Sequence, residues 1–198
     1  CCSIAMVSNG LIKAATKNAR HNVDIMEKAV EKTGAPIVGA SSTCIMTMRD
    51  EYPHLLGIDN SKVRDSLDLA TKFIFKKISE GKKLNFRKDF HARIAYHTPC
   101  HLERLGWEYF SIELLKMIPG VELTVLESCC CGIAGTYGFK KENYEVSQAI
   151  GRPLFEQIAA VGPDFVACDC ETCKWQIEMS TGVSVKHPVS VLAEAICD

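Results

Sequence analysis

The sequence has no long hydrophobic run, no strong net charge and no recognisable secretion signal. No stretch of about eighteen apolar residues occurs, so we expect no transmembrane helix. The formal net charge is −1, which leaves no basic field to attract nucleic acid, and we expect no nucleic-acid partner. A charged start, an apolar run and a small-residue cleavage site do not occur in series.

An initiating methionine is also missing, because the chain begins Cys1-Cys2-Ser3. We therefore expect a fragment or a processed product, from which an N-terminal targeting segment could have been lost. The 198 residues suit one large domain or two small ones. That length is enough to bury a hydrophobic core without covalent cross-links.

Cysteine, by contrast, is abundant and clustered. The chain has eleven cysteines, of which three are adjacent at 129–131 and three more lie within 168–173. A disulfide framework normally spaces its cysteines along a shorter, secreted chain. The clustering therefore indicates metal ligands or redox-active thiols in a reducing compartment.

One pattern occurs twice, at an offset of 129 residues. Cysteine pairs stand at 1–2 and 130–131, and residues 3–40 and 132–169 separate them from Ser41-Ser42-Thr43-Cys44 and Cys170-Glu171-Thr172-Cys173. An internal repeat of this kind indicates two versions of one structural unit. We place the first unit, truncated at its start, at 1–88 and the second at 89–198, with the polar, basic stretch 82–91 as the linker.

Hydrophobic spacing predicts alternating strands and helices. This alternation predicts an α/β fold with two Rossmann-like units, each a parallel sheet flanked by helices. Ligand sites in such sheets collect at the carboxyl ends of the strands, and each cysteine group here follows a predicted strand. The predicted strands are 36–40, 93–97, 121–126 and 164–167, and the predicted helices are 13–33, 61–80, 102–117, 143–161, one beginning near 172, and 188–196.

The second unit carries five cysteines in a spaced pattern. Residues 101–129 separate Cys100 from the pair Cys130-Cys131, and Cys170 and Cys173 follow as a C-x-x-C motif. Iron prefers soft thiolate ligands, and a glycine after the cysteine pair permits an irregular turn that brings both sulfurs to one centre. Five thiolates exceed the four that tetrahedral zinc or a cubane cluster requires.

Three strings in the sequence resemble the cysteine-rich CCG-domain family: CHLERLGW (100–107), ESCCCGIAGTYGFKKENY (127–144) and CDCETCKWQIEMSTG (168–182). Within it, the branch formed by the C-subunits of anaerobic glycerol-3-phosphate dehydrogenase is the most similar. The B-subunit of heterodisulfide reductase and the iron–sulfur subunits of glycolate and lactate oxidation are more distant. The resemblance implies a non-cubane [4Fe–4S] cluster with five ligands: Cys100, Cys130, Cys131, Cys170 and Cys173.

The same resemblance implies an electron-transfer subunit rather than an enzyme acting on glycerol 3-phosphate itself. Its expected partners are flavin-containing dehydrogenase subunits, from which electrons pass toward membrane quinone. Its expected location is cytoplasmic, peripheral on the cytoplasmic face of the inner membrane. The sequence has no phosphate loop, catalytic triad or nucleotide fingerprint, which agrees with this expectation.

The first unit departs from the pattern and gives a weaker, second candidate site at Cys1, Cys2 and Cys44. Ser41 stands where the repeat predicts a cysteine, and Ser3 stands where it predicts glycine. A serine hydroxyl is a poorer iron ligand than a thiolate. We expect this site to be empty or weakly loaded.

Three other functions remain open on the residues alone. Four of the thiolates would suffice for a structural zinc site. Cys170 and Cys173 would suit a thiol–disulfide oxidoreductase. By analogy with heterodisulfide reductase, the cluster itself could cleave a disulfide substrate. Iron, sulfide and zinc analysis separates the zinc site from the cluster.

Several residues near the motif have a simpler interpretation. Cys129, Cys168 and Cys197 are expected to be small buried hydrophobes, although a register slip would let Cys129 replace its neighbour. His97 and His101 flank the first motif cysteine. We expect them to be structural or to line the surroundings of the metal rather than to bind it.

Overall fold

The computed structural model describes residues 1–197, which form two compact units. The first unit is Cys1–Ala70 and the second begins at Thr71, earlier than the expected border between residues 88 and 89. Helix α6 (Ala70–Ser79) explains the difference, because the hydroxyls of Thr71 and Ser111 share a hydrogen bond of 2.9 Å within the second unit. Within the described residues, no helix is long and apolar enough to cross a membrane.

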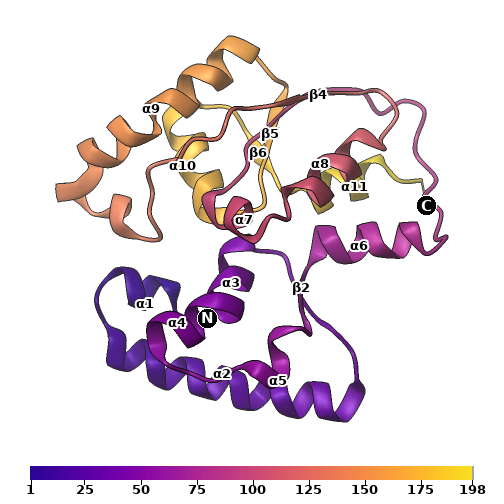
Figure 1. Ribbon diagram of the computed structural model, residues 1–198. Helices are drawn as coiled ribbons and strands as arrows, with labels where there is room; N and C mark the ends of the chain where they lie inside the picture. The colour runs from indigo at the N-terminus through magenta and orange to yellow at the C-terminus, as the bar shows by residue number, and fades with distance from the viewer. Residues whose placement is uncertain (198) are drawn as a thin grey trace. The chain divides into compact units, whose positions relative to one another are not determined.

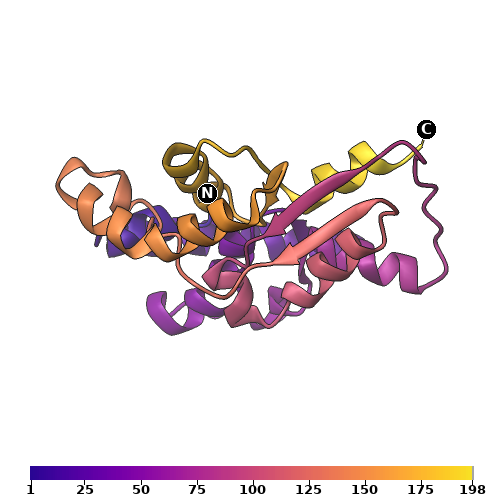
Figure 2. The same cartoon turned by 90° about the horizontal axis from the view of Figure 1, so that it is seen from above.

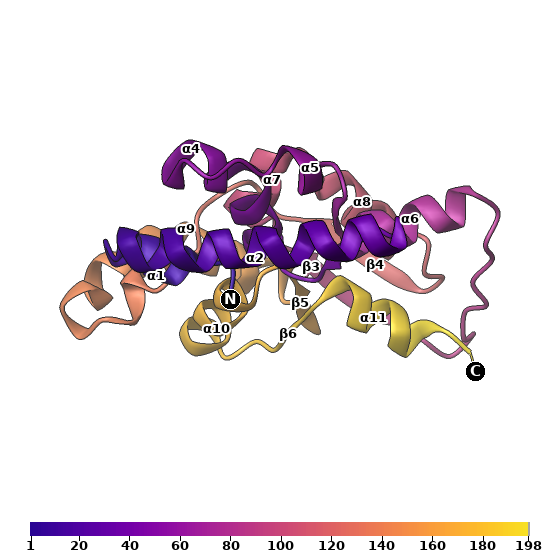
Figure 3. The same ribbon diagram turned by 90° about the horizontal axis from the view of Figure 1, so that it is seen from below.

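The first unit is built on one long helix and a two-stranded parallel sheet. Helix α2 buries Ala15, Ala19, Val23 and Met26 and ends at Gly34, which has a left-handed φ of 62°. Figure 3 shows α4 and α5 along the side of α2. The elements are α1 (Ile4–Ser8), α2 (Ile12–Thr33), β1 (Ile37–Gly39), α3 (Ser42–Met46), the π-helix η1 (Thr47–Glu51), α4 (Tyr52–Leu56), α5 (Ser61–Arg64) and β2 (Leu67–Leu69).

The prediction of one continuous helix over 61–80 is wrong. The structure has the short helix α5, then strand β2, then α6. Leu67 and Leu69 pair with Ile37 and Gly39 of β1, and all three residues of β2 are buried. Parallel pairing satisfies the backbone of this buried segment, so tertiary contact overrides the helical spacing of its apolar residues.

The second unit (Figure 1) contains a four-stranded parallel sheet, whose strands pair in the order β4-β3-β5-β6. Ile94 of β3 lies between Leu123 of β4 and Phe165 of β5. Figure 2 shows β3 and β4 side by side and running in the same direction. Every connection between neighbouring parallel strands must cross over, so their carboxyl ends meet at one edge.

Helices cover both faces of this sheet. Ala95 packs in one cluster with Ile158 of α9 and Ile177 of α10, whereas Tyr96, the next residue, points to the other side, toward α8. These parallel sheets flanked by helices confirm the predicted α/β fold. The elements after α6 are β3 (Ala92–Tyr96), α7 (Cys100–Leu105), α8 (Glu108–Lys116), β4 (Val121–Val125), η2 (Tyr137–Phe139), η3 (Lys141–Asn143), α9 (Tyr144–Val161), β5 (Phe165–Ala167), α10 (Glu171–Thr181), β6 (Val185–Lys186) and α11 (Pro188–Ala195).

Two further predictions need correction. The helix expected over 102–117 is two helices, because Gly106 adopts a left-handed φ of 67° between α7 and α8. Strand β6 was not predicted, since two residues are too few to give a periodic signal. The turns after the two cysteine pairs share one backbone feature: Ser3 has a φ of 76° and Gly132 a φ of 88°.

Candidate metal centre

The five predicted ligands come from the carboxyl ends of three neighbouring strands. Cys100 is the first residue of α7, which follows β3. The pair Cys130-Cys131 lies in the loop after β4, and Cys170 stands at the N-cap position of α10, three residues after the end of β5. Cys173 lies in the first turn of α10. The fold therefore brings together residues that are up to 73 positions apart in the chain.

The thiols of these residues form one connected group. Cys131 Sγ lies 3.2 Å from Cys173 Sγ. Cys130 Sγ shares hydrogen bonds with the thiols of Cys100 and Cys131 and accepts one of 3.3 Å from the backbone N–H of Gly132. Coulombic interaction links Cys100 to Cys170 as well. All five predicted residues therefore lie at one place in the second unit.

The hydrogen bonds divide the charge unequally among the thiols. Donation by Cys100 and then by Cys131 lowers the pKa of Cys130 to about 2. The same hydrogen bonds raise the pKa of Cys100 and of Cys131 above the ordinary thiol value. These hydrogen bonds therefore favour negative charge on Cys130 over its two neighbours, Cys100 and Cys131.

Exposure also differs across the group. Cys131, Cys170 and Cys173 are buried, Cys130 is half-buried and Cys100 is exposed. The buried sulfurs belong to the hydrophobic cluster that contains Leu126 and Ile133. The site is therefore buried among apolar residues at Cys131, Cys170 and Cys173 and accessible to solvent at Cys100.

The turn after the cysteine pair requires glycine. Gly132 has a φ of 88°, and a Cβ atom there would lie 2.0 Å from the backbone oxygen of Ser147 in α9. The Ser147 hydroxyl donates a hydrogen bond of 2.9 Å to the Gly132 carbonyl, and Gln176 donates to Ser147 in turn. Helices α9 and α10 therefore hold the cysteine pair at close range.

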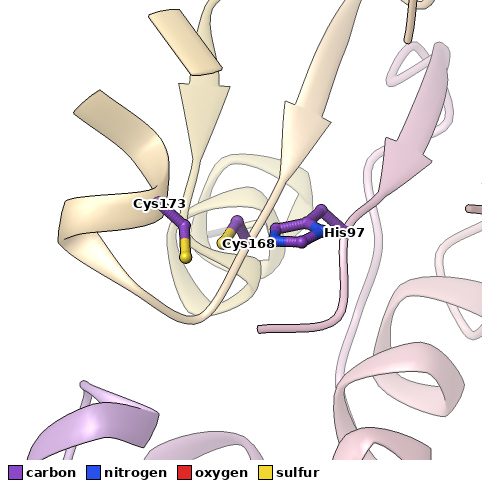
Figure 4. A group of neighbouring side chains, drawn as sticks. All are labelled: His97, Cys168 and Cys173. Carbon is purple, nitrogen blue, oxygen red and sulfur yellow. The ribbon is translucent and has the colours of Figure 1, made fainter. Parts of the chain in front are cut away.

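Two residues outside the predicted set lie in the same group. One ring nitrogen of His97 and the sulfurs of Cys168 and Cys173 all lie within 4.8 Å of one another, and all three residues are buried (Figure 4). Burial lowers the pKa of His97 to about 4 and raises the pKa of Cys168. The position of His97 agrees with the expectation that it lines the surroundings of the metal, whereas Cys168 was expected only to be a small buried hydrophobe. Their positions directly after β3 and β5, at the edge where ligand sites collect, were the available signal.

The other cysteines of the second unit lie outside this group. Cys129 Sγ accepts a hydrogen bond of 3.4 Å from Gln157, so Cys130 rather than Cys129 is the partner of Cys100. Cys197 is exposed, contrary to the expectation that it is a buried hydrophobe. All eleven cysteines, which lie within residues 1–197, are free thiols.

Asp169 lies between two of the cysteines and is fully buried. Its carboxylate accepts hydrogen bonds from two other buried side chains. The Tyr96 hydroxyl donates to Asp169 Oδ2 at 2.7 Å, and the Ser111 hydroxyl donates to Oδ1 at 2.9 Å. Burial raises the pKa of this carboxyl. The network fixes the loop that carries Cys168 and Cys170 to β3 and α8.

The second candidate site is a separate pocket in the first unit. Cys1, Cys2 and Cys44 line a cavity of about 330 Å³ together with four other residues, which are Asn22, Ile25, Met26 and Met48. A hydrogen bond with Cys44, together with burial, raises the pKa of Cys2. The three predicted residues thus share one pocket, and Ser41 stands at the N-cap position of α3, the helix that contains Cys44.

Comparison with known proteins points to one family. Residues 94–178 match the family called CCG, cysteine-rich domain. The chain is 53% identical, over 99% of its length, to the C-subunit of the anaerobic glycerol-3-phosphate dehydrogenase of Escherichia coli K12, of which it covers 49%. It is 31% identical to lactate utilization protein A of Geobacillus sp. WCH70, over 86% of this chain and 71% of that protein.

A third relative is an uncharacterized iron–sulfur protein of Methanocaldococcus jannaschii, 25% identical over 99% of this chain and 39% of the relative. The chain thus spans about half the length of the dehydrogenase subunit. The matched range 94–178 contains all five thiols of the connected group.

Proposed function

The chain belongs to the cysteine-rich CCG-domain family, and on that premise we propose that it is an iron–sulfur electron-transfer subunit. The observation that supports this proposal is the convergence of five thiols at the carboxyl ends of β4, β3 and β5. The proposed ligands are Cys100, Cys130, Cys131, Cys170 and Cys173.

The donor set suits an iron–sulfur cluster. Iron clusters are held by cysteine thiolates, and five such donors surround one place here, more than a cubane cluster or a tetrahedral ion uses. We therefore propose a non-cubane [4Fe–4S] cluster. When bound, such a group supplies one-electron transfer without bond-making.

Three features of the surrounding residues suit the five-thiol site to an electron-transferring cluster. The Gly132 N–H donates to Cys130 Sγ, and such hydrogen bonds favour a charged sulfur. The apolar cluster around Leu126 and Ile133 excludes water from the inner wall. Cys100 remains exposed, so electrons have a short path between the site and a docked partner.

The proposed partners follow from the similarity to the dehydrogenase subunit. Flavin-containing dehydrogenase subunits would oxidise glycerol 3-phosphate and pass electrons to this chain. The chain would pass them toward membrane quinone, while lying peripherally on the cytoplasmic face of the inner membrane. It would take no catalytic part in the oxidation of glycerol 3-phosphate.

Two alternatives each have a specific observation in their favour. Similarity to lactate utilization protein A favours an equivalent role with a different dehydrogenase. The group of His97, Cys168 and Cys173 favours a structural zinc site, because three nitrogen and sulfur donors within 4.8 Å suit a tetrahedral ion. One zinc ion per chain without labile sulfide would favour that second alternative.

The two units are proposed as repeats of one CCG unit, with 1–88 and 89–198 as the sequence repeats. The first unit keeps Cys1, Cys2 and Cys44 in one pocket but has Ser41 in the place of a fourth thiol. We propose that this pocket holds no cluster or holds one weakly in this chain.

The test uses the assembled complex of the full-length protein with its flavin-containing partners, kept anaerobic. Addition of glycerol 3-phosphate should change the electron paramagnetic resonance signal of the cluster within the turnover time. Cys100→Ser should abolish that change, and Cys197→Ser, at an exposed thiol outside the group, should leave it intact. An unchanged signal in the wild-type complex, with iron and sulfide present, would refute the electron-transfer role.

A further inference from the structure

His97 is a buried polar residue with an unused hydrogen-bonding atom beside the thiols. It directly follows β3, and only 1% of its surface is exposed. Its backbone N–H donates to the Ala167 carbonyl of β5 at 3.0 Å, which fixes the residue at the strand edge. Figure 4 shows its ring facing Cys168 and Cys173. The Nε2 atom has no hydrogen-bond partner among residues 1–197.

A buried nitrogen such as His97 Nε2 is expected to have a hydrogen-bond partner. Native proteins rarely leave a buried polar group unpaired, because its hydration is lost without compensation. The fold does supply partners elsewhere in this unit: Asp169, also fully buried, receives hydrogen bonds from Tyr96 and Ser111. Two other buried atoms within the described part of the chain are unpaired, Glu108 Oε2 and Gln176 Oε1. Of these three residues with an unpaired buried atom, only His97 belongs to the group of possible metal ligands.

We infer that His97 donates its Nε2–H to a sulfur atom of the cluster held by the five cysteines, and thereby raises the reduction potential of that cluster. The inference rests on the proposed function, because it needs a cluster in the site. The ring is suited to this role, since a neutral imidazole carries one N–H donor. Five thiolates already supply the iron ligands, which leaves the negatively charged sulfurs as the remaining acceptors.

The direction of the effect follows from charge. Reduction adds one negative charge to the cluster, and an N–H donor stabilises the more negative state. Loss of this donor should lower the equilibrium constant for reduction about tenfold, which for one electron is a fall of about 59 mV in the midpoint potential. His97 would then be a positioning residue that tunes the potential, and Cys168 a buried neighbour that does not bind iron.

The test compares three variants of the full-length, anaerobically purified protein. His97→Phe removes the donor and keeps a planar ring. His97→Gln keeps an N–H donor on a flexible chain. His101→Phe changes the other histidine beside Cys100, which lies outside the ligand group, and serves as the matched control.

A redox titration followed by paramagnetic resonance should give the lower potential for His97→Phe, with iron and sulfide content unchanged. His97→Gln should recover at least part of the shift, and His101→Phe should match the wild type. An exchangeable proton coupled to the reduced cluster should be detectable in the wild type and absent from His97→Phe. The wild-type coupling needs no variant, so the inference stays testable if His97→Phe does not fold.

Unfolding of the iron-free protein gives an independent readout. If His97 serves the cluster, His97→Phe should unfold at the same temperature as the wild type or higher, because an unpaired buried group is removed. A large fall would mean a structural role and overturn the inference. An unshifted potential, or a strong nitrogen coupling from direct iron ligation, would also overturn it. Absence of iron and sulfide from the wild type would instead refute the proposed function.

Discussion

Substitution of Gly132 by alanine tests how the cysteine pair is held. The new Cβ would lie 2.0 Å from the Ser147 backbone oxygen, 3.0 Å from its carbonyl carbon and 3.1 Å from the Gly151 nitrogen. All three atoms belong to the backbone of α9, so no side-chain rotation relieves the collision. Either the turn that carries Cys130 and Cys131 or helix α9 must move.

Two contributions set the magnitude. The left-handed φ of 88° costs an alanine about 1–2 kcal/mol. Overpacking against a fixed backbone costs about 1–3 kcal/mol more. The free energy of unfolding should therefore fall by about 2–5 kcal/mol, a large share of the roughly 5–15 kcal/mol of a typical protein.

Gly162→Ala is the matched control. Gly162 also has a left-handed φ, of 58°, and no atom lies within 4 Å of a Cβ placed there. This variant carries the backbone penalty without the collision and should lose only about 1–2 kcal/mol. The difference between the two variants isolates the contact with α9.

The assay is denaturant unfolding of the iron-free protein, followed by tryptophan fluorescence. Both tryptophans of this chain, Trp107 and Trp175, lie in the second unit. The tryptophan fluorescence of residues 1–198 therefore reports the unfolding of that unit alone. Equal destabilisation by Gly132→Ala and Gly162→Ala would refute the close packing of the cysteine turn on α9. Iron content of the loaded protein should fall for Gly132→Ala only.

Two further substitutions test neighbouring parts of the account. Tyr96→Phe removes a hydrogen bond of 2.7 Å to the buried Asp169 and should lower the free energy of unfolding by about 1–3 kcal/mol, and an unchanged value would contradict the network. Cys44→Ser should leave iron and sulfide in the second unit unchanged, because its pocket is separate, and a loss equal to that of Cys100→Ser would show that the first unit holds the cluster.

The sequence predicted the long helices well, and the five cysteines chosen from the spacing lie together in the structure, for a physical reason. Helices α2 and α9 each run for several turns and end at glycines with left-handed φ, so both periodicity and end signals were present. The cysteine groups follow strands, and parallel strands bring their carboxyl ends together whatever the loop lengths. The geometry of a parallel sheet therefore made it possible to predict, from the spacing of the cysteines, that they lie at one edge of the sheet.

The failures concern contacts that no local pattern encodes. Strand β2 is three buried residues whose conformation depends on pairing with β1. Cys168 lies beside His97 only because β3 and β5 are adjacent in the sheet, and the motif spacing did not place Cys168 in this group. The left-handed φ of Ser3 had one signal, its alignment with Gly132 in the repeat, although serine itself adopts that conformation rarely.

A scan of all eleven cysteines is the most direct test of the central claim. Each is replaced singly by serine in the full-length protein, which is purified without oxygen, and iron and labile sulfide are measured per chain. We predict loss of the cluster for Cys100, Cys130, Cys131, Cys170 and Cys173 and its retention for the other six. Retention in any of the five variants, or loss at Cys129 or Cys197, would contradict the account.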